Sequence, residues 1–215
     1  SRALAADPSI DLLVAGRDEN KASAFATALN CHALGVAVDW QGPHLVRALQ
    51  AHGVQLLIHT AGPFQGQDYT VAQACAQAGA HYIDLADGRR FVCDFAAALQ
   101  APFAAANRVA ITGASTVPAL SSAVVDSLCH GWQRIHTIDI CIAPAQTAPR
   151  GVATLEAVLS YCGLPVQLWR SGRWQAATGW GGLQRVQFQR LRPRLGAVCD
   201  IPDLELFPAH YRVQN

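Results

Sequence analysis

The sequence predicts an α/β protein in which a doubly wound parallel sheet is followed by a second, smaller α+β domain. Over residues 1–130, short apolar runs alternate with segments of helical periodicity, which is typical of βαβ units wound into a parallel sheet. In the later part, the segments 137–142 and 186–189 instead alternate between apolar and polar residues, as in half-buried strands of an antiparallel or mixed sheet. We therefore expect two domains, over residues 1–130 and 131–215.

Composition and charge narrow the class of protein. The chain has 215 residues, of which 51% are apolar and 14% are charged, so it can bury a large core. A formal net charge of +1 gives no electrostatic attraction to nucleic acid or to an anionic membrane. No run approaches the ~20 apolar residues of a membrane-spanning helix. The sequence therefore predicts a cytoplasmic protein without a nucleic-acid or membrane partner.

The cysteines give no sign of a metal site. Seven of them are scattered singly along the chain, and no two form a Cys-x-x-Cys pair. This spacing favours reduced, buried thiols over a disulfide framework. Because a structural zinc site needs pairs of close ligands, we expect no metal.

The first elements begin in the middle of a βαβ unit. Residues 1–6 resemble the end of a helix, and the apolar run 12–15 predicts a strand. The next helix has an apolar stripe that we expect to be buried, made of Ala22, Phe25, Ala26 and Leu29. A short strand through Val36 follows, and then a helix that Gly53 ends.

Three further strands are expected in the first domain. Residues 54–58 form a nearly continuous apolar run, which predicts a central parallel strand covered on both faces. Asp68 can cap the helix that follows, and residues 81–85 form the next strand. An alanine-rich helix over 91–107 and a strand over 109–112 continue the same pattern.

The second domain is expected to contain hairpins. Residues 138–142 and 186–188 alternate between apolar and polar side chains and predict half-buried strands. Residues 170–173, which tryptophans flank, predict a tight hairpin turn. A helix over 155–162 precedes Gly163, which is suited to end it.

The order of elements in the first domain is Rossmann-like. In such domains a G-x-G-x-x-G turn lies between the first strand and the first helix, where its backbone amides bind the pyrophosphate of a dinucleotide. The chain does not open on this fingerprint. We therefore expect the first strand and its glycine-rich loop to precede Ser1.

Gly16 and Arg17 stand at the end of the strand where a dinucleotide-binding domain selects its cofactor. An acidic residue at this position binds the ribose 2′-hydroxyl of NAD, whereas an arginine suits the 2′-phosphate of NADP. The sequence therefore predicts NADP, with NAD as the weaker candidate. An exposed arginine at the start of a helix is the alternative explanation, and Asp18 is expected to cap that helix.

Two later turns are further candidates for cofactor binding. Asp39 and Trp40 follow a strand, where a carboxylate and an aromatic ring can flank an adenine, although a plain loop explains them equally well. The other turn follows the apolar run 54–58 and consists of Thr60, Ala61, Gly62, Pro63 and Phe64. Its glycine allows close approach of a ligand, its proline fixes the turn, and its phenylalanine offers an apolar wall.

These motifs, in this order, resemble the saccharopine dehydrogenase family. The resemblance rests on Ala-Gly-Arg at 15–17, Thr-Ala-Gly-Pro-Phe at 60–64, His-Tyr-Ile-Asp-Leu at 81–85 and Gly-Ala-Ser-Thr-Val-Pro at 113–118. It spans about residues 1–130. It implies an NAD(P)-dependent oxidoreductase of the cytosol, often a homodimer, that acts on an amino-acid-derived or carboxylated small molecule.

Catalytic residues are not identified from the sequence. Tyr82, Asp84 and Ser115 lie near the carboxyl ends of predicted strands, where open α/β sheets bind ligands, so they are candidates for the substrate cleft. Roles in a buried strand or a cap explain them as well. Arg150 is a further candidate, as a ligand of a substrate carboxylate. If no proton donor lines the cleft, the alternative function is a non-catalytic NADP-binding sensor or scaffold.

Overall fold

A three-stranded parallel sheet carries the main core of the computed structural model, which describes residues 2–29, 32–145, 147 and 151–215. The sheet has the order β3 (Leu56–His59), β4 (His81–Asp84) and β5 (Ala110–Ile111). Both pairs of neighbouring strands are parallel, with Leu57 opposite Tyr82 and Ile83 opposite Ile111. The three strands therefore end at one common edge.

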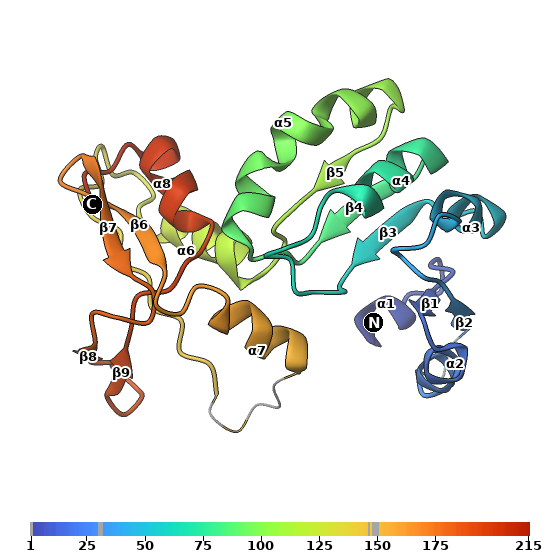
Figure 1. Cartoon of the computed structure of the whole chain (residues 1–215), viewed down its shortest axis with the longest axis horizontal. Coiled ribbons are helices and arrows are strands. Elements are labelled where there is room, and N and C mark those ends of the chain that lie inside the picture. The colour runs from blue at the N-terminus through green and yellow to red at the C-terminus, as the bar shows by residue number, and fades with distance from the viewer. Residues whose placement is uncertain (1, 30–31, 146, 148–150) are drawn as a thin grey trace.

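Three helices cover one face of this sheet (Figure 1). They are α3 (Leu45–Ala51), α4 (Thr70–Ala78) and α5 (Arg89–Ala105). Their apolar side chains form one buried cluster around Tyr82, to which aromatic rings on α5 and in the loops contribute. As the sequence predicts, Gly53 and Gly79 follow the ends of α3 and α4 with positive φ, a conformation that glycine adopts without strain.

The opposite face of the sheet is apolar but open. Leu56, Ile58 and Ile111 share this face and are 51%, 41% and 50% exposed. The prediction that the strand at 54–58 is covered on both faces is therefore wrong for the part of the chain that is described here. Periodicity identifies the apolar residues of a strand, but it does not supply the element that covers them.

A second parallel pair, β1 (Leu13–Gly16) and β2 (Leu34–Ala37), lies beside the three-stranded sheet and is not hydrogen-bonded to it. Helix α2 (Glu19–Thr27) packs on this pair, and α1 (Arg2–Ala5) precedes it. Asp18 caps α2, as predicted, because its side chain accepts a hydrogen bond from the backbone N–H of Lys21. Phe25, however, is 49% exposed and so corrects the predicted buried stripe, since two strands are too narrow to cover it.

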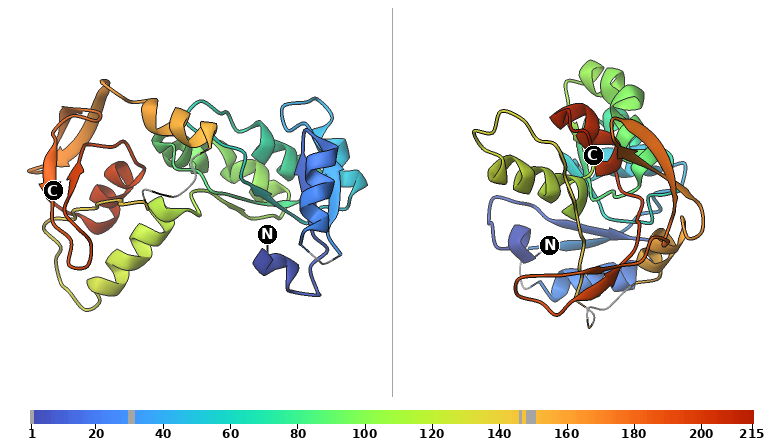
Figure 2. Two further views of the ribbon diagram at one scale, coloured as in Figure 1. Left: turned by 90° about the horizontal axis from the view of Figure 1, so that it is seen from below. Right: turned by 90° about the vertical axis from the view of Figure 1, so that its left-hand side faces the viewer.

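Most of the remaining elements lie at the other end of the molecule from β1 and β2 (Figure 2). A π-turn, Thr116–Leu120, leads into α6 (Ser121–Leu128), and α7 (Val152–Leu159) follows. Two antiparallel hairpins come next, β6 (Pro165–Arg170) with β7 (Arg173–Thr178) and β8 (Gln184–Val186) with β9 (Arg194–Gly196), before α8 (Asp203–Tyr211). The predicted hairpin turn is confirmed: Ser171 and Gly172 both have positive φ, which suits a two-residue turn.

One predicted strand does not form. Residues 138–142 belong to no strand, and Ile140 and Ile142 are 36% and 43% exposed. The backbone near this segment bonds to the chain terminus, as in the hydrogen bond from Ile138 N–H to the Asn215 carbonyl. Alternating side chains suit a strand, but a strand also needs a partner along its length, and the described residues provide none here.

Helix α8 packs against elements of the first 130 residues. The hydroxyl of Ser121, on α6, donates a hydrogen bond to Oδ1 of Asp203, and the Tyr211 hydroxyl donates to Oδ1 of Asp126 at 2.8 Å. Leu206 packs against the main core cluster. The domain boundary at residues 130 and 131 stays a prediction, and α8 is the part of the later sequence that contacts the first part most directly.

The buried carboxyl of Asp203 predicts a pH effect on stability. Burial raises the pKa of this group in the folded chain, although the hydrogen bond from Ser121 acts against that shift. A raised carboxyl pKa gives stability that is complete below the unfolded pKa of about 3.9 and is lost as the pH rises through the folded pKa. We expect Asp203→Asn to raise the melting temperature at pH 7 by about 2–4 °C and to change it little at pH 3.5. Thermal unfolding at both pH values measures this, and an equal shift at both would contradict it.

Candidate functional site

Most of the residues that the sequence singles out lie at the carboxyl edge of one of the two parallel sheets. Gly16 ends β1 and Arg17 follows it, the turn 60–64 follows β3, Asp84 ends β4, and Ser115 follows β5. Ligands of open α/β sheets bind at this edge, because loops there leave the sheet in different directions and expose backbone groups. We therefore take this edge as the candidate functional site.

Arg17 is exposed and free to meet a ligand. Its guanidinium makes no hydrogen bond or ion pair with the residues described in the structure, and a Cβ added at Gly16 would meet no atom within 4 Å. The neighbouring carboxylate of Asp18 is directed toward α2, where it also lies 3.5 Å from the Lys21 ammonium. The one cationic group at the end of β1 is thus accessible and not neutralised by its acidic neighbour.

Asp39 and Trp40 make different contacts within the chain. The Asp39 side chain accepts a hydrogen bond from the backbone N–H of Gln41 and its carbonyl accepts one from Gly42, so Asp39 stabilises a tight turn. Trp40 is half-buried and packs on the core, with its ring centroid 5.8 Å from that of His59. Both contacts are those of a structural loop, and their contact with an adenine stays a prediction.

The turn 60–64 is held in shape by a side chain that the sequence did not single out. The amide nitrogen of Gln67 donates to the carbonyls of Ala61 and Pro63, at 2.6 and 2.8 Å, and the Gly62–Pro63 peptide is cis. Nothing in the pattern of the sequence distinguishes Gln67 from an ordinary polar residue, since its partners are backbone carbonyls. Thr60 is exposed beside this ordered backbone.

Phe64 differs from its predicted role. The prediction makes it an apolar wall for a ligand, but the ring is 5% exposed and packs against Phe91 and His59, with centroids 5.4 and 5.1 Å away. The residue therefore anchors the turn to the core. Gly62 has no atom closer than 3.7 Å to an added Cβ, so space beside its backbone is open.

His59 and Tyr82 form a buried polar pair under this turn. Nδ1 of His59 lies 3.0 Å from the Tyr82 hydroxyl, and the two residues are 5% and 1% exposed. Burial lowers the pKa of His59, although the charge of Asp84 acts in the opposite direction. Burial also raises the pKa of Tyr82, and Asp84 adds to that shift. Both groups are therefore neutral at physiological pH, and the place of Tyr82 in a substrate cleft stays a prediction.

Asp84 joins the ends of β4 and β5. Its Oδ1 accepts hydrogen bonds from the backbone N–H of Ala86 at 3.0 Å, from that of Gly113 at 2.8 Å and from the Thr112 hydroxyl at 3.0 Å. The side chain is 0% exposed. Its observed contacts are therefore internal, and a contact of Asp84 with substrate stays a prediction. Ser115, which is half-buried, lies two residues beyond this junction and remains a candidate.

Arg150 lies outside the described residues, so its predicted contact with a substrate carboxylate has no structural counterpart. Among the residues that are described, no group of three or more His, Cys, Asp or Glu side chains is placed to hold a metal ion. Over the same ranges, no helix combines the length and the apolarity that crossing a bilayer requires.

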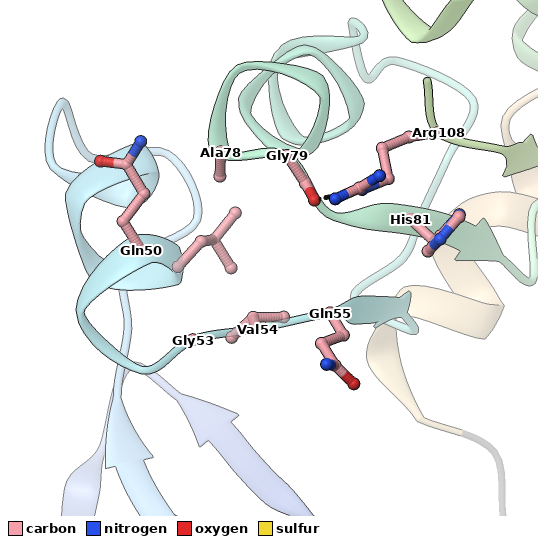
Figure 3. Close-up of a pocket in the computed structure, with 9 residues that line it drawn as sticks. Gln50, Gly53, Val54, Gln55, Ala78, Gly79, His81 and Arg108 are labelled. Atoms are coloured by element: carbon pink, nitrogen blue, oxygen red, sulfur yellow. Dashed lines mark hydrogen bonds between the residues drawn. The ribbon is translucent and has the colours of Figure 1, made fainter. Parts of the chain in front are cut away.

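Two cavities lie away from the turn 60–64. One, of about 590 Å³, is at the amino ends of β3 and β4, where Figure 3 shows Gln50, Gln55, His81 and Arg108 around it. Arg108 there donates a hydrogen bond to the carbonyl of Gly79, the residue that caps the end of α4. The other, of about 690 Å³, is mainly apolar and is lined by α6 and by the segment 132–144. The first cavity is at the edge opposite to the one where parallel sheets bind ligands.

Known proteins resemble this chain in both sequence and fold. The model of the saccharopine dehydrogenase NADP-binding domain matches residues 2–126. Carboxyaminopropylagmatine dehydrogenase from Synechocystis sp. is 29% identical over 152 residues, which make up 67% of this chain and 38% of that protein.

A solved structure supports the fold class. The apo, histidine-tagged saccharopine dehydrogenase (L-Glu forming) from Saccharomyces cerevisiae superposes with a TM-score of 0.68 at 13% identity, over 99% of this chain and 49% of that one. At this identity the likeness concerns the fold, and it confirms the predicted α/β, Rossmann-like class. The chain spans less than half of the length of either relative.

Proposed function

This chain belongs to the saccharopine dehydrogenase family, whose NADP-binding domain it carries, and we propose that it is an NADP-dependent oxidoreductase acting on an amino-acid-derived or carboxylated small molecule. The single observation that carries the proposal is the exposed guanidinium of Arg17, unpaired within the described residues, at the carboxyl end of β1. An arginine at this position recognises the 2′-phosphate that distinguishes NADP from NAD.

The residues of the carboxyl edge fit the cofactor. Arg17 would bind the 2′-phosphate, and the open space beside Gly16 leaves room for the ribose. The backbone of Ala61 and Gly62, ordered by Gln67, would lie along the dinucleotide, with Thr60 as a polar neighbour. The bound cofactor supplies hydride transfer, and the protein contributes binding and orientation.

The substrate class is supported by the names of the relatives. One is a saccharopine dehydrogenase that forms L-Glu, and the other is a dehydrogenase of carboxyaminopropylagmatine. Both names point to amino-acid-derived molecules. For this chain we propose the same broad class, with Tyr82, Asp84, Ser115 and Arg150 as candidates near the substrate and no assigned proton donor.

The proposal also covers the oligomeric state, the localisation and the partners of the protein. We propose a homodimer in the cytoplasm, without nucleic-acid or membrane partners. The family resemblance supports the dimer, and the net charge of +1 supports the exclusion of polyanionic partners.

Cofactor titration and a turnover screen test this function. Intrinsic fluorescence should show that NADPH binds more tightly than NADH, because only NADPH carries the phosphate that Arg17 recognises. NADPH oxidation is then followed with pairs of oxo acids and amino acids, and we expect turnover with at least one pair. Binding without turnover on any pair would favour the NADP-binding sensor or scaffold. Absence of NADPH binding would contradict both functions.

A further inference from the structure

Arg89 connects the two parts of the molecule at a point next to the candidate site. It is the first residue of α5 and follows the short segment that leaves the end of β4. Its Nε donates to Oε2 of Glu205 at 3.1 Å, and its Nη1 donates to Oδ1 of Asp200 at 3.2 Å and to the Gln167 carbonyl at 2.9 Å. Only 9% of the side chain is exposed. All three partners belong to the later part of the chain.

The partners of Arg89 come from separate elements. Gln167 lies in β6, Asp200 precedes α8, and Glu205 lies within α8. The ring of Trp174, on β7, lies under the guanidinium, with its centroid 5.4 Å from Cζ. A single side chain therefore fixes a hairpin and a helix of the later part against the start of α5. The flat, forked guanidinium suits this arrangement, because its donors point in several fixed directions at once.

The segment that leads into Arg89 also packs against the turn 60–64. Gly88 packs so tightly against that turn that an added Cβ would lie 3.2 Å from the backbone carbon and oxygen of Phe64. The side-chain Nε2 of Gln65 donates to Oδ1 of Asp87 at 3.1 Å. The junction at Arg89 therefore lies directly beside the turn 60–64, which Gln67 and the packing of Phe64 hold in shape without it. The contacts of α8 with Ser121 and Asp126 reach only α6.

We propose that Arg89 is a positioning residue, which sets the orientation of the later part of the chain over the carboxyl edge and so the placement of a carboxylated substrate relative to the cofactor. The proposal rests on the proposed function. Arg89 itself is not expected to bind NADP, because its Nε and Nη1 are engaged with Glu205, Asp200 and Gln167 and only 9% of its side chain is exposed. Its effect should appear in substrate binding and in the mobility of the junction, and not in affinity for NADPH.

Arg90 provides a matched control. It is the next residue on α5, but its side chain is 72% exposed and it pairs with Asp94 one turn along the same helix, at 2.7 Å. Its contact with Glu205 is longer, at 3.9 Å. Exposed ion pairs of this kind contribute little. Arg89→Ala and Arg90→Ala thus remove the same charge at adjacent positions, and only the first removes the buried contact with β6, α8 and Asp200.

The experiment compares Arg89→Ala, Arg89→Lys and Arg90→Ala by hydrogen–deuterium exchange, NADPH titration and steady-state kinetics with the substrate found in the turnover screen. For Arg89→Ala we expect exchange at 84–88 and 165–170 to accelerate by about tenfold, and KM for the carboxylated substrate to rise by about tenfold, with NADPH affinity within about twofold of wild type. Arg89→Lys keeps the charge but loses the fork, so we expect a smaller change in the same direction. Arg90→Ala should match the wild type.

The outcomes separate this proposal from the proposed function. If Arg89→Ala matches Arg90→Ala in exchange and in KM, Arg89 does not position the later part. If Arg89→Ala fails to fold, Arg89→Lys decides: wild-type exchange and kinetics would reduce Arg89 to a stabilising role and overturn the proposal. If wild-type protein neither binds NADPH nor turns over, the proposed function fails and the positioning of substrate fails with it. The exchange measurement would then still show whether Arg89 holds the junction together.

Discussion

Replacing Arg17 with alanine is expected to weaken NADPH binding by about 10- to 100-fold and to leave NADH affinity within about twofold of wild type. The side chain is exposed and has no competing partner among the described residues. Its removal therefore takes away the charge-assisted hydrogen bonds to the 2′-phosphate, which contribute about 1.5–3 kcal/mol, and leaves no buried group unsatisfied. Titration of both cofactors at one fixed ionic strength measures the difference, since salt screens exposed charges.

Lys21→Ala is the matched control for Arg17→Ala. Lys21 is a cation one turn along α2, its side chain is 86% exposed, and it pairs with Asp18. Its loss changes the net charge by the same amount but removes no group from the end of β1. We expect it to change NADPH affinity by less than about threefold. An equal loss of NADPH and NADH affinity in Arg17→Ala would show that Arg17 does not read the phosphate.

Asp84→Ala is expected to destabilise the fold by about 3–5 kcal/mol. One buried oxygen of this side chain satisfies the backbone N–H groups of Ala86 and Gly113 and the Thr112 hydroxyl. Alanine cannot accept any of these bonds, and each buried donor left without a partner costs about 1–3 kcal/mol. Since chains of this size are stable by only about 5–15 kcal/mol, the melting temperature should fall by about 10 °C or more. Urea unfolding measures the loss in the free energy of unfolding, and thermal unfolding measures the fall in melting temperature.

Asp84→Asn separates the acceptor from the charge. The asparagine oxygen can replace Oδ1, which makes all three hydrogen bonds, while its amide would replace Oδ2, for which the described residues provide no partner. We therefore expect this variant to lose less than half as much stability as Asp84→Ala. If the two variants were equally unstable, the negative charge of Asp84 would matter more than its hydrogen bonds. If Asp84→Ala cost less than about 1 kcal/mol, its role at the strand ends would be contradicted.

Features that depend on a few neighbouring residues were predictable. Asp18 caps α2 because its carboxylate reaches a backbone N–H three residues ahead, and Ser171 and Gly172 make a hairpin turn because their conformations are local. The α/β class was predictable for a related reason: periods of 3.6 and 2 identify helices and strands without knowledge of their partners. By contrast, the residues 138–142 have the period of a strand but lack a paired neighbour along their length in the described part of the chain.

The same distinction applies to the candidate site. Arg17 could be selected from the sequence, since the role proposed for it follows from its position after a strand. The sequence could not rank Phe64 as a core residue, because its neighbours His59 and Phe91 come from other elements. Gln67 and Arg89 escaped notice for the same reason. Their partners are carbonyls and carboxylates that approach only once the chain has folded.

The sequence by itself therefore determined the class of fold, the order of its elements and the motifs of the family, all of which arise from short-range spacing. Only the tertiary structure decided which polar side chains hold the strand ends together, which apolar faces are covered, and how the later part of the chain is fastened beside the turn 60–64. The physical reason is that burial and hydrogen bonding depend on what lies across space from a residue. For Asp84 and Arg89 those neighbours are up to 29 and 116 positions away along the chain.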